Sequence, residues 1–410
     1  MNKILISGII LCILGIGSGC KEKNKDKSVE VIHINPFEAS EEINLSEFVD
    51  SIIYIKLQTD SICVLGRLHD IIIREKYIYA SDISQQILFV FDKNGKYITK
   101  LDKRGKGPDE YLRMSGVFID DNEEFIELIN SSGKNSILKY SNITFKLIEK
   151  RPIINISSNS CIRHANSYYF ATQQNENIIN DKPTNANLII IKENRVVKLF
   201  DKNIITNHSS FSPYLESFIK NDKNELFVSI VYDNTFYRIE DLSVHPAIRI
   251  DFGKFGIDNS IGNKPLTEQL KYVKKINGLA SFPVLNLNNS EIMSFSYGFK
   301  QDIKERMFKD SDYRQYIKLK KNNKTFHTKV IKNDLSGFPA EVHLNTTYHN
   351  ISHDIWYKDY LVDIILPYKL FSNGEKRMMT NEIGEINIED NPIIILMKLK
   401  KDLRMTKKSH

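Results

Sequence analysis

The stretch FDKNGKYITKLDKRGKGPDEY, residues 91–111, decides how the rest of the chain is interpreted. Asn94-Gly95 predicts a tight hairpin turn, because these residues accept the positive φ values that such a turn requires. The flanking residues 86–91 and 96–101 carry the alternating apolar pattern of paired strands. This part of the chain is therefore predicted to form two antiparallel strands, followed by a loop rich in glycine and charge.

The loop at residues 104–111 is interpreted as a joint that returns the chain to begin the next sheet. The two glycines can accept positive φ, and the proline fixes φ. The acids can accept hydrogen bonds and pair with the arginine. The tyrosine ring is expected to lie between neighbouring sheets. A phosphate-binding loop is the alternative. It lacks the Gly-Lys-Ser/Thr ending, and two acids would repel phosphate. The residues assigned to the joint are Arg104, Gly105, Gly107, Pro108, Asp109, Glu110 and Tyr111.

Pairs of strand-like segments recur from residue 29 onward, starting with the alternating VEVIHIN (29–35). Pairs that return every ~40–60 residues are typical of propeller blades. In one predicted turn, Asp120-Asp121 and Glu123-Glu124 are expected to be exposed. The other strand pairs are expected in residues 70–82, 118–131, 136–150, 168–174 with 187–201, 225–243, and 290–298 with 316–331.

Two further segments complete the predicted fold. Residues 264–278 are predicted to form a short helical insertion, with Leu266, Leu270, Val273 and Ile276 on one face. The apolar NPIIILMKLK (391–400) is predicted to be a late strand that completes a blade begun near the N-terminus. Pairing the two ends in this way would close a ring and remove free sheet edges.

The first residues have the features of a lipoprotein signal. A cationic start and an apolar run are followed by small residues before Cys20, in a segment too short to span a membrane comfortably. We expect residues 1–19 to be removed, Cys20 to be lipidated and residues 20–28 to form a polar tether. Residues 29–410 then form the domain. Whether Cys63 and Cys161 pair is left open.

At this point the chain resembles the six-bladed β-propeller lipoproteins of Bacteroidetes-type bacteria. The resemblance rests on the F-D-x-x-G-K hairpin, the G-x-G-P-x-E-Y loop, LSEFVDSIIYIKLQT (45–59) and EDNPIIILMKLK (389–400). The same combination of a hairpin and a glycine-containing loop is similar to the pattern of NHL-repeat propellers. The resemblance implies an all-β, six-bladed β-propeller of four-stranded antiparallel blades around a central channel. It implies no common reaction and no catalytic residues to transfer.

Residues that could carry chemistry are densest between positions 341 and 360. His349, His353, Trp356 and Tyr357 are the candidate ligand-binding residues, since aromatic rings can stack on a sugar or peptide. A metal site is not expected, because histidines four apart on a strand lie ~13 Å from each other. No cofactor is expected, and no catalytic motif is recognised. The formal charge of +6 shows no basic face, so a nucleic-acid partner is not expected.

The sequence therefore favours a non-enzymatic binding or scaffold module, held to the outer membrane by its lipid and presented to an envelope protein or glycan. Lys21, directly after the cysteine, gives no aspartate-type inner-membrane retention signal. Two alternatives stay open: a glycan-active hydrolase or lyase with its site at the channel mouth, and an envelope sensor or signalling adaptor. The oligomeric state and the side of the membrane are left open.

Overall fold

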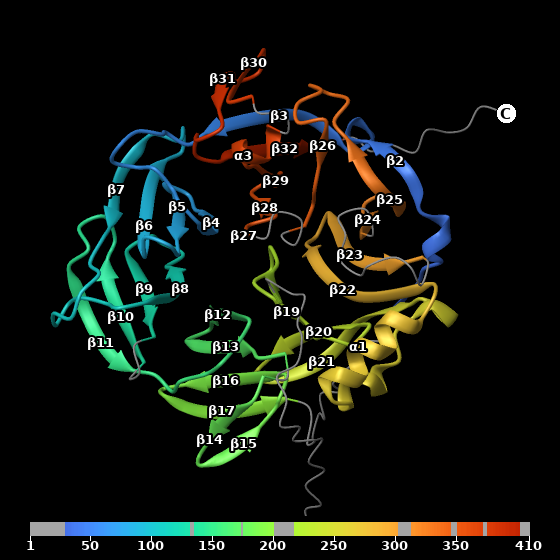
Figure 1. The fold of residues 1–410 in the computed structure, drawn as a ribbon, viewed down its shortest axis with the longest axis horizontal. Helices are drawn as coiled ribbons and strands as arrows, with labels where there is room; N and C mark the ends of the chain where they lie inside the picture. Colours follow the sequence, from blue (N-terminus) through green and yellow to red (C-terminus); the bar gives the residue numbers. More distant parts are fainter. Residues whose placement is uncertain are drawn as a thin grey trace, which may run out of the picture.

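The computed structural model describes residues 29–131, 135–173, 175–200, 217–301, 313–345, 351–371 and 375–401. It is a ring of six sheets, or blades, arranged around a central axis (Figure 1). This confirms the predicted six-bladed β-propeller of four-stranded blades, and the pairing within the blades is mostly antiparallel. The predicted signal segment, Cys20, the polar tether and His349 lie outside the described residues.

Blades 1, 2 and 3 follow one another along the chain, and their four antiparallel strands run in sequence order from the axis outward (Figure 1). Blade 1 consists of β4 (Leu68–Ile73), β5 (Tyr77–Asp82), β6 (Ile87–Asp92) and β7 (Tyr97–Leu101). Blade 2 consists of β8 (Met114–Ile119), β9 (Phe125–Asn130), β10 (Ser136–Ser141) and β11 (Leu147–Pro152). Blade 3 consists of β12 (Ser160–His164), β13 (Ser167–Ala171), β16 (Leu188–Lys192) and β17 (Arg195–Phe200), with the hairpin β14 (Asn177–Ile179) and β15 (Lys182–Thr184) inserted between β13 and β16.

Blades 4 and 5 repeat this plan, and each gains an outer strand from the N-terminal part of the chain. Blade 4 consists of β18 (Phe218–Lys220), β19 (Leu226–Ser229), β20 (Thr235–Glu240) and β21 (Ser243–Asp251). Blade 5 consists of β22 (Leu279–Asn288), β23 (Ile292–Lys300), β24 (Tyr313–Leu319) and β25 (Lys324–Lys332), with the short β26 (Glu341–Val342) also paired to β25. The added strands, β1 (Glu30–His33) on β21 and β2 (Ser40–Asn44) on β25, run parallel to their partners.

Blade 6 joins the two ends of the chain. It consists of β28 (Trp356–Tyr357), β29 (Tyr360–Ile365), β32 (Ile393–Leu399) and, outermost, β3 (Val49–Lys56). The β3–β32 pairing is antiparallel and runs from Val49 opposite Leu399 to Lys56 opposite Ile393. The ring is thus closed by the two segments predicted from the sequence.

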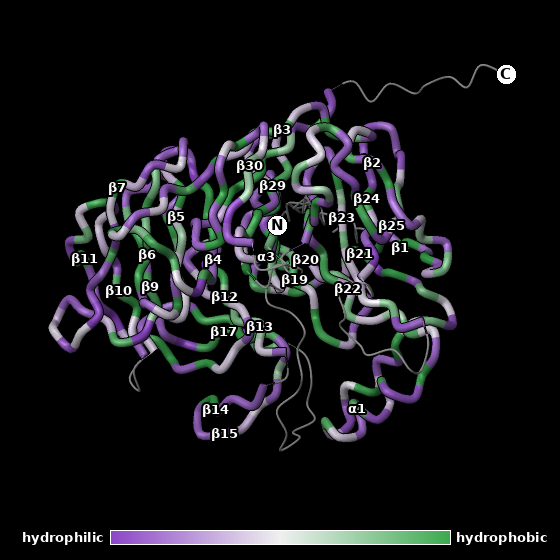
Figure 2. Tube along the Cα trace, turned by 45° about the horizontal axis from the view of Figure 1, so that its top comes forward, coloured by the Kyte–Doolittle hydropathy of each residue, from purple (hydrophilic) through white to green (hydrophobic). Residues whose placement is uncertain are grey.

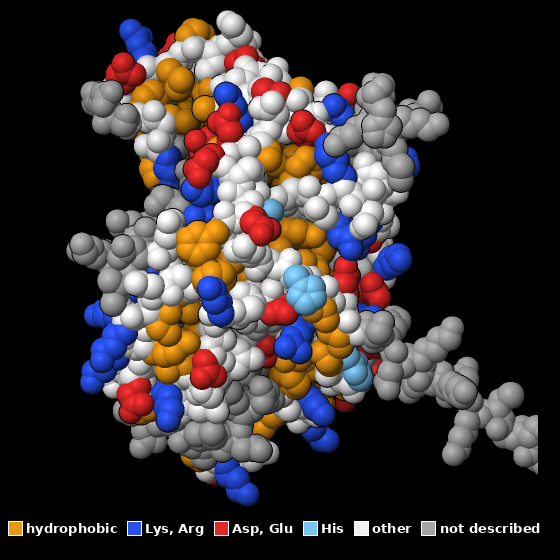
Figure 3. Space-filling model, turned by 90° about the vertical axis from the view of Figure 1, so that its right-hand side faces the viewer, with side chains coloured by type: hydrophobic (Ala, Val, Ile, Leu, Met, Phe, Trp, Pro, Cys, Tyr) orange, Lys and Arg blue, Asp and Glu red, His pale blue; other side chains and the backbone are white. Residues whose placement is uncertain are grey.

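The strands β1, β2 and β3 form a belt, residues 30–56, along the outer edges of blades 4, 5 and 6. The short helices η1 (Pro36–Glu38) and η2 (Leu45–Glu47) connect these strands. Figure 3 shows acidic and basic side chains interleaved on this side of the molecule. The belt forms ion pairs with blade 5, including Glu30 with Lys318 at 2.7 Å and Glu47 with Lys324 at 2.6 Å. Because surface pairs contribute only about 0–1 kcal/mol each, backbone pairing and buried apolar side chains hold most of the belt.

The core is divided among the interfaces between neighbouring blades. On β32, Ile393 and Ile395 pack into the cluster between blades 5 and 6, whereas Ile394 and Leu396 pack into the cluster between blades 6 and 1. Both faces of such a strand are buried, which explains its continuous apolar run. Figure 2 shows hydrophobic residues concentrated along the strands and hydrophilic residues at many of the turns.

The ring has two different faces. Turns between the first and second strands, and between the third and fourth strands, lie at one end of the blades; we call this the hairpin face. Connections between the second and third strands, and between blades, lie at the other end, which we call the insertion face. The β14–β15 hairpin and α1 (Leu266–Lys275) both belong to the insertion face and protrude on the same side of the ring (Figure 2). Blade 6 adds α3 (Pro367–Leu370) and the hairpin β30 (Arg377–Thr380) and β31 (Gly384–Asn387) in its equivalent connection.

Helix α1 confirms the predicted insertion, but its buried face differs from the prediction. Gln269 is 3% exposed and Leu270 is 42% exposed, so the amide is buried and the leucine is not. The reason is that the Gln269 side chain donates to Lys264 O at 2.7 Å and accepts from the Tyr232 hydroxyl at 2.7 Å. At the other end, Lys300 Nζ donates to Val273 O at 2.9 Å, which places a cation at the helix C-terminus.

Candidate functional site

The predicted joint, residues 104–111, connects β7 of blade 1 to β8 of blade 2. Gly105 N–H donates to Tyr111 O at 2.9 Å and closes the loop. Tyr111 is fully buried in the cluster between blades 1 and 2, and its hydroxyl donates to Gln86 O at 2.7 Å. Burial raises the pKa of Tyr111 to about 12, so the hydroxyl stays protonated. The loop therefore connects the two blades through one buried aromatic ring.

The role predicted for Gly105 and Gly107 is only partly right, because neither adopts a positive φ. What matters is the absence of a side chain. A Cβ on Gly105 would lie 2.0 Å from Glu110 Oε2, and Gly107 N–H donates to the same oxygen at 2.6 Å. The carboxylate of Glu110 thus occupies the space that the phosphate-loop alternative would need for its ligand.

The ion pair expected from Arg104 is formed by a neighbour. Lys103 Nζ lies 2.6 Å from Asp109 Oδ2, and this interaction lowers the pKa of Asp109. The backbone of the loop is also held by blade 2, since Pro108 O accepts from Lys150 at 3.1 Å. Arg104 itself bridges to the backbone of Tyr111.

The histidine-rich segment enters blade 6 from the axis. His353 lies in β27 (Ser352–His353), which pairs in parallel with β4, and His353 is 6% exposed. Trp356 packs against the cluster between blades 5 and 6, whereas Tyr357 packs against the cluster between blades 6 and 1. These two rings therefore lie on opposite sides of β28. Ligand binding by His349, His353, Trp356 and Tyr357 stays a prediction, and the structure does not bring the two rings to one surface.

Tyr357 already has a cationic neighbour. Lys93 Nζ lies 4.0 Å from the centre of its ring and donates to Arg74 O at 2.8 Å. Burial, reinforced by the positive charge of Lys358, lowers the pKa of Lys93 to about 8. The ring face that could have stacked on a ligand is therefore used in packing at this blade interface.

Glu123 was expected to be exposed, and this expectation is wrong. It is 5% exposed, and its carboxylate accepts from the backbone N–H of Lys76 at 2.7 Å and of Tyr77 at 3.1 Å. Glu123, which belongs to blade 2, therefore holds the turn between β4 and β5 of blade 1. Asp121 and Glu124 are exposed as predicted, and Asp120 is half-buried.

Metal and disulfide chemistry can be assessed for the described part of the chain. Within it, no group of three or more His, Cys, Asp or Glu side chains is placed to hold a metal ion. Cys63 lies in the cluster between blades 6 and 1, and Cys161 lies against the cluster between blades 2 and 3. The two cysteines therefore do not form the disulfide that the sequence left open.

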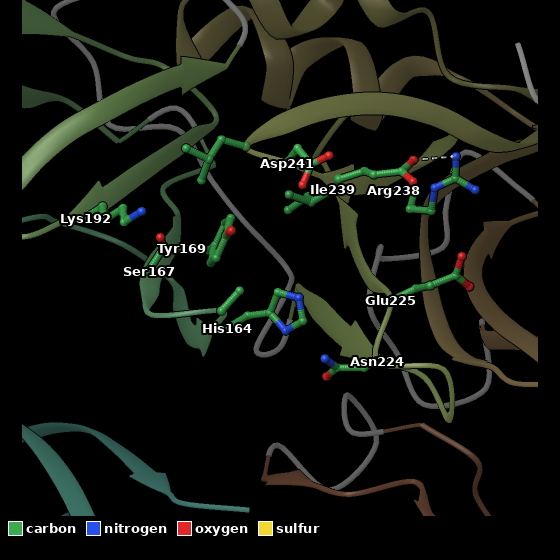
Figure 4. Close-up of a pocket in the computed structure, with 12 residues that line it drawn as sticks. His164, Ser167, Tyr169, Lys192, Asn224, Glu225, Arg238, Ile239 and Asp241 are labelled. Atoms are coloured by element: carbon green, nitrogen blue, oxygen red, sulfur yellow. Dashed lines mark ion pairs between the residues drawn. The ribbon is translucent and has the colours of Figure 1, made fainter. Parts of the chain in front are cut away.

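A hollow of about 470 Å³ opens on the hairpin face between blades 3 and 4 (Figure 4). The turns β12–β13, β18–β19 and β20–β21 supply most of its walls. Figure 4 shows His164 and Tyr169 on the blade 3 side, with Asn224 and Glu225 across from them on blade 4. The hollow is lined by His164, Ala165, Ser167, Tyr169, Lys192, Asn224, Glu225, Arg238, Ile239, Glu240, Asp241 and Leu242.

Charges of both signs surround this hollow. Arg238 forms an ion pair with Glu240 at 3.1 Å, and its Nε is buried without a hydrogen-bond partner in the described structure. Burial, and to a smaller extent the charge of Lys220, lower the pKa of His164, so its ring is neutral near pH 7. The hollow therefore offers acceptors, donors and a neutral imidazole over a short distance.

Sequence reasoning did not predict this site. Its residues come from four separate segments and follow no recognisable spacing. Their turns carry positive φ without glycine, as at Ala165 (φ 45), Asn166 (φ 61), Asp241 (φ 47) and Leu242 (φ 64). The usable signal was the strand–turn–strand pattern itself, since first-turn and last-turn residues of adjacent blades meet on one face.

The ring closure and the six inter-blade clusters define the protein as a closed six-bladed β-propeller. The sequence model of the family described as "Domain of unknown function (DUF4934)" matches residues 29–398. The chain belongs to this family.

Solved structures agree on the fold. A protein from Bacteroides fragilis, assigned as exported, is 16% identical with a TM-score of 0.63, and the match covers 90% of this chain and 100% of that one. A DUF4221 family member from Bacteroides vulgatus is 11% identical with a TM-score of 0.51, covering 86% of this chain and 97% of that one. No curated protein sequence matches the chain. Among the helices that the structure describes, none combines the length and the apolar character that a membrane span requires.

Proposed function

We propose that the protein is a binding propeller of the cell envelope, which holds a charged saccharide in the hollow between blades 3 and 4. The observation that carries this proposal is the hollow itself. Its volume of about 470 Å³ falls in the range of roughly 300–1,000 Å³ that small-molecule sites usually have.

The lining suits a sugar that carries charge. Lys192 and Arg238 can bind an acidic substituent, while Asp241 can accept from hydroxyl or ammonium groups. The half-buried ring of His164 adds a flat surface beside these polar groups, and the buried Tyr169 supports it with 6.2 Å between the ring centres. Protein partners usually bind through hot spots with a large apolar contact area, and this polar hollow offers little such area.

Binding is favoured over catalysis because two of the acids already have partners. Glu240 is paired with Arg238, and Glu225 accepts from Asn221 Nδ2 at 2.8 Å. Both acids fix the walls of the hollow through these contacts. Cleavage of the bound saccharide, as in the hydrolase alternative, would appear as new reducing ends during the binding assay.

The location of the protein forms part of the proposal. The sequence before residue 29 supports export, lipidation of Cys20 and an outer-membrane anchor. The assignment of the Bacteroides fragilis structure as exported agrees with this. Replacing Cys20 with serine should abolish incorporation of labelled fatty acid and move the protein out of the membrane fraction. Unchanged labelling would rule out this anchor.

The binding test uses the chain from residue 21 on an array of acidic, amino and neutral glycans, followed by calorimetry with the best ligand. Arg238→Ala should weaken binding about tenfold or more, because a charge-assisted hydrogen bond is lost. Lys198→Ala, an exposed cation on blade 3 outside the hollow, is the matched control. If no charged glycan on the array binds, or if Arg238→Ala binds as tightly as the parent, the saccharide proposal is refuted. If a pull-down instead captures an envelope protein that binds the same face, that protein would replace the saccharide as the proposed ligand.

A further inference from the structure

A second, smaller hollow lies on the insertion face. It has a volume of about 260 Å³ and is formed by the end of the β13–β16 connection, the β19–β20 connection and the short helix η4 (Asn259–Asn263). Since antiparallel strands connect at alternate ends, this hollow and the one in Figure 4 lie on opposite faces of the ring. Its lining residues are Asn187, Ile230, Val231, Tyr232, Asp233, Asn259, Ser260 and Asn263.

Asn187 supplies an unused acceptor at this hollow. The residue is 1% exposed, and its Oδ1 is buried without a hydrogen-bond partner in the described structure. Its backbone is fixed, with its N–H donating to Phe200 O at 3.0 Å and its O accepting from Thr172 N–H at 2.9 Å. An unpaired buried amide oxygen is unfavourable because it has lost its hydrogen bonds to water, so a donor that reaches it from the hollow relieves this cost.

The surrounding groups carry no available charge. Neither lysine nor arginine is among the lining residues, and the single acid, Asp233, accepts from Thr235 N–H at 2.9 Å and from the Tyr237 hydroxyl at 2.6 Å. The remaining polar side chains, Asn259, Ser260 and Asn263, are uncharged and exposed. An anionic ligand would find no counter-charge here, and a cation would find no free carboxylate.

The floor of the hollow is rigid. Tyr232 adopts φ 60, in the left-handed region that bulky residues rarely occupy, and its hydroxyl donates to Gln269 Oε1 at 2.7 Å. Its ring packs against Phe282, itself at φ 54, with 5.3 Å between the ring centres. Gln173 Oε1 accepts from Val231 N–H at 2.8 Å and holds the neighbouring backbone. Tyr232 and the backbone of Val231, which line the hollow, are therefore held in place before a ligand binds.

We propose that this hollow is a binding site for a neutral saccharide, one or two rings in size, whose hydroxyl groups donate to Asn187 and bond to the amides of η4. Sugar hydroxyls both donate and accept, which matches a set of amides and a serine hydroxyl. The site is independent of the charged hollow of the proposed function, because the two share no residue and open on opposite faces.

The test is saturation-transfer NMR on the chain from residue 21, with glucose, galactose, mannose, N-acetylglucosamine and their disaccharides as probes. At least one probe should show transfer, and the variant Asn259→Ala/Asn263→Ala should weaken its binding about tenfold. Both residues are exposed, so this variant should fold; Asn187→Leu, which removes the buried acceptor, is the second variant. Asn122→Ala, an exposed asparagine on the hairpin face, is the matched control and should bind as the parent does.

The outcomes separate this site from the charged one. Binding that Asn259→Ala/Asn263→Ala weakens and Arg238→Ala does not supports the proposal. Absence of transfer from every neutral probe overturns it. The proposal is also overturned if transfer is unchanged in the double variant, or if Arg238→Ala abolishes transfer. A preference for peptides over every sugar would overturn it as well.

Discussion

Two glycines with the same φ have very different surroundings. Gly95 and Gly384 both adopt φ 83, but a Cβ on Gly95 would lie 2.2 Å from Lys56 O, whereas a Cβ on Gly384 would have nothing within 4 Å. Gly384→Ala should therefore cost only the left-handed conformation, about 1–2 kcal/mol. Gly95→Ala should cost about 1–3 kcal/mol more, because it also forces the hairpin turn of blade 1 away from β3.

Urea denaturation of both variants and the parent measures this difference directly. Equal destabilisation by the two substitutions would show that the contact between Gly95 and the end of β3 is not tight. Comparable slopes of the transitions would confirm that the variants unfold from similarly compact structures.

At the residue scale, the sequence predicted where turns occur better than it predicted whether the side chains in those turns are buried. Asn94-Gly95 was recognised as a turn, because only a few residue pairs accept positive φ at low cost. The turn at Glu193 (φ 48) and Asn194 (φ 58) adopts positive φ at two positions without a glycine to mark it. Glu123 was assigned to solvent because it lies in a predicted hairpin turn, whereas its burial depends on contacts with the adjacent blade.

At the element scale, the belt of residues 30–56 is the main departure from a simple repeat. Alternation in VEVIHIN (29–35) indicated a strand, and the structure confirms β1 there. The sequence could not identify β21 as its partner, since parallel pairing between distant segments leaves no local pattern. Within the belt, Ile32 and Ile34, each 7% exposed, pack into the cluster between blades 4 and 5.

Removing β1 and β2 should weaken the propeller without opening it. A chain that begins at residue 45 keeps β3 but loses Ile32 and Ile34, each of which contributes roughly 1.5–3 kcal/mol when buried. We expect a folded monomeric ring whose free energy of unfolding is lower by roughly 3–6 kcal/mol. The chain from residue 29 is the reference.

Circular dichroism, urea denaturation and size-exclusion chromatography test this expectation. Loss of the cooperative transition would show that β1 and β2 are required for folding of the ring. Larger particles in solution would indicate that the uncovered edges of β21 and β25 pair with other molecules.

At the scale of the whole molecule, the closed ring explains what sequence could and could not establish. Closure was predictable because the two segments that make it, residues 45–59 and 389–400, are locally apolar and strand-like. The hollows were not predictable, because each one exists only where turns from neighbouring blades meet. Both lie beside blades 3 and 4, and four short segments contribute to the larger one.

The same closure yields the most direct test of the architecture. A chain that begins at residue 60 lacks β3, which leaves β32 without its outer neighbour and exposes the clusters on both sides of blade 6. We expect this chain to lose cooperative unfolding, because two of the inter-blade clusters can no longer exclude water. Adding a peptide of residues 45–59 should restore the ring, since β3 joins blade 6 only at its outer edge.

Trp356 is the sole tryptophan of the chain and packs against the cluster between blades 5 and 6, so its fluorescence reports this closure. The emission should shift to longer wavelength in the shortened chain and return when the peptide is added. A peptide in which Ile55 and Leu57, both buried, are replaced by serine is the matched control and should not restore it, because each loses its apolar contact with the cluster between blades 6 and 1. Native emission and a cooperative transition without any peptide would show that β3 is dispensable, and the ring would then owe its stability to the blades themselves.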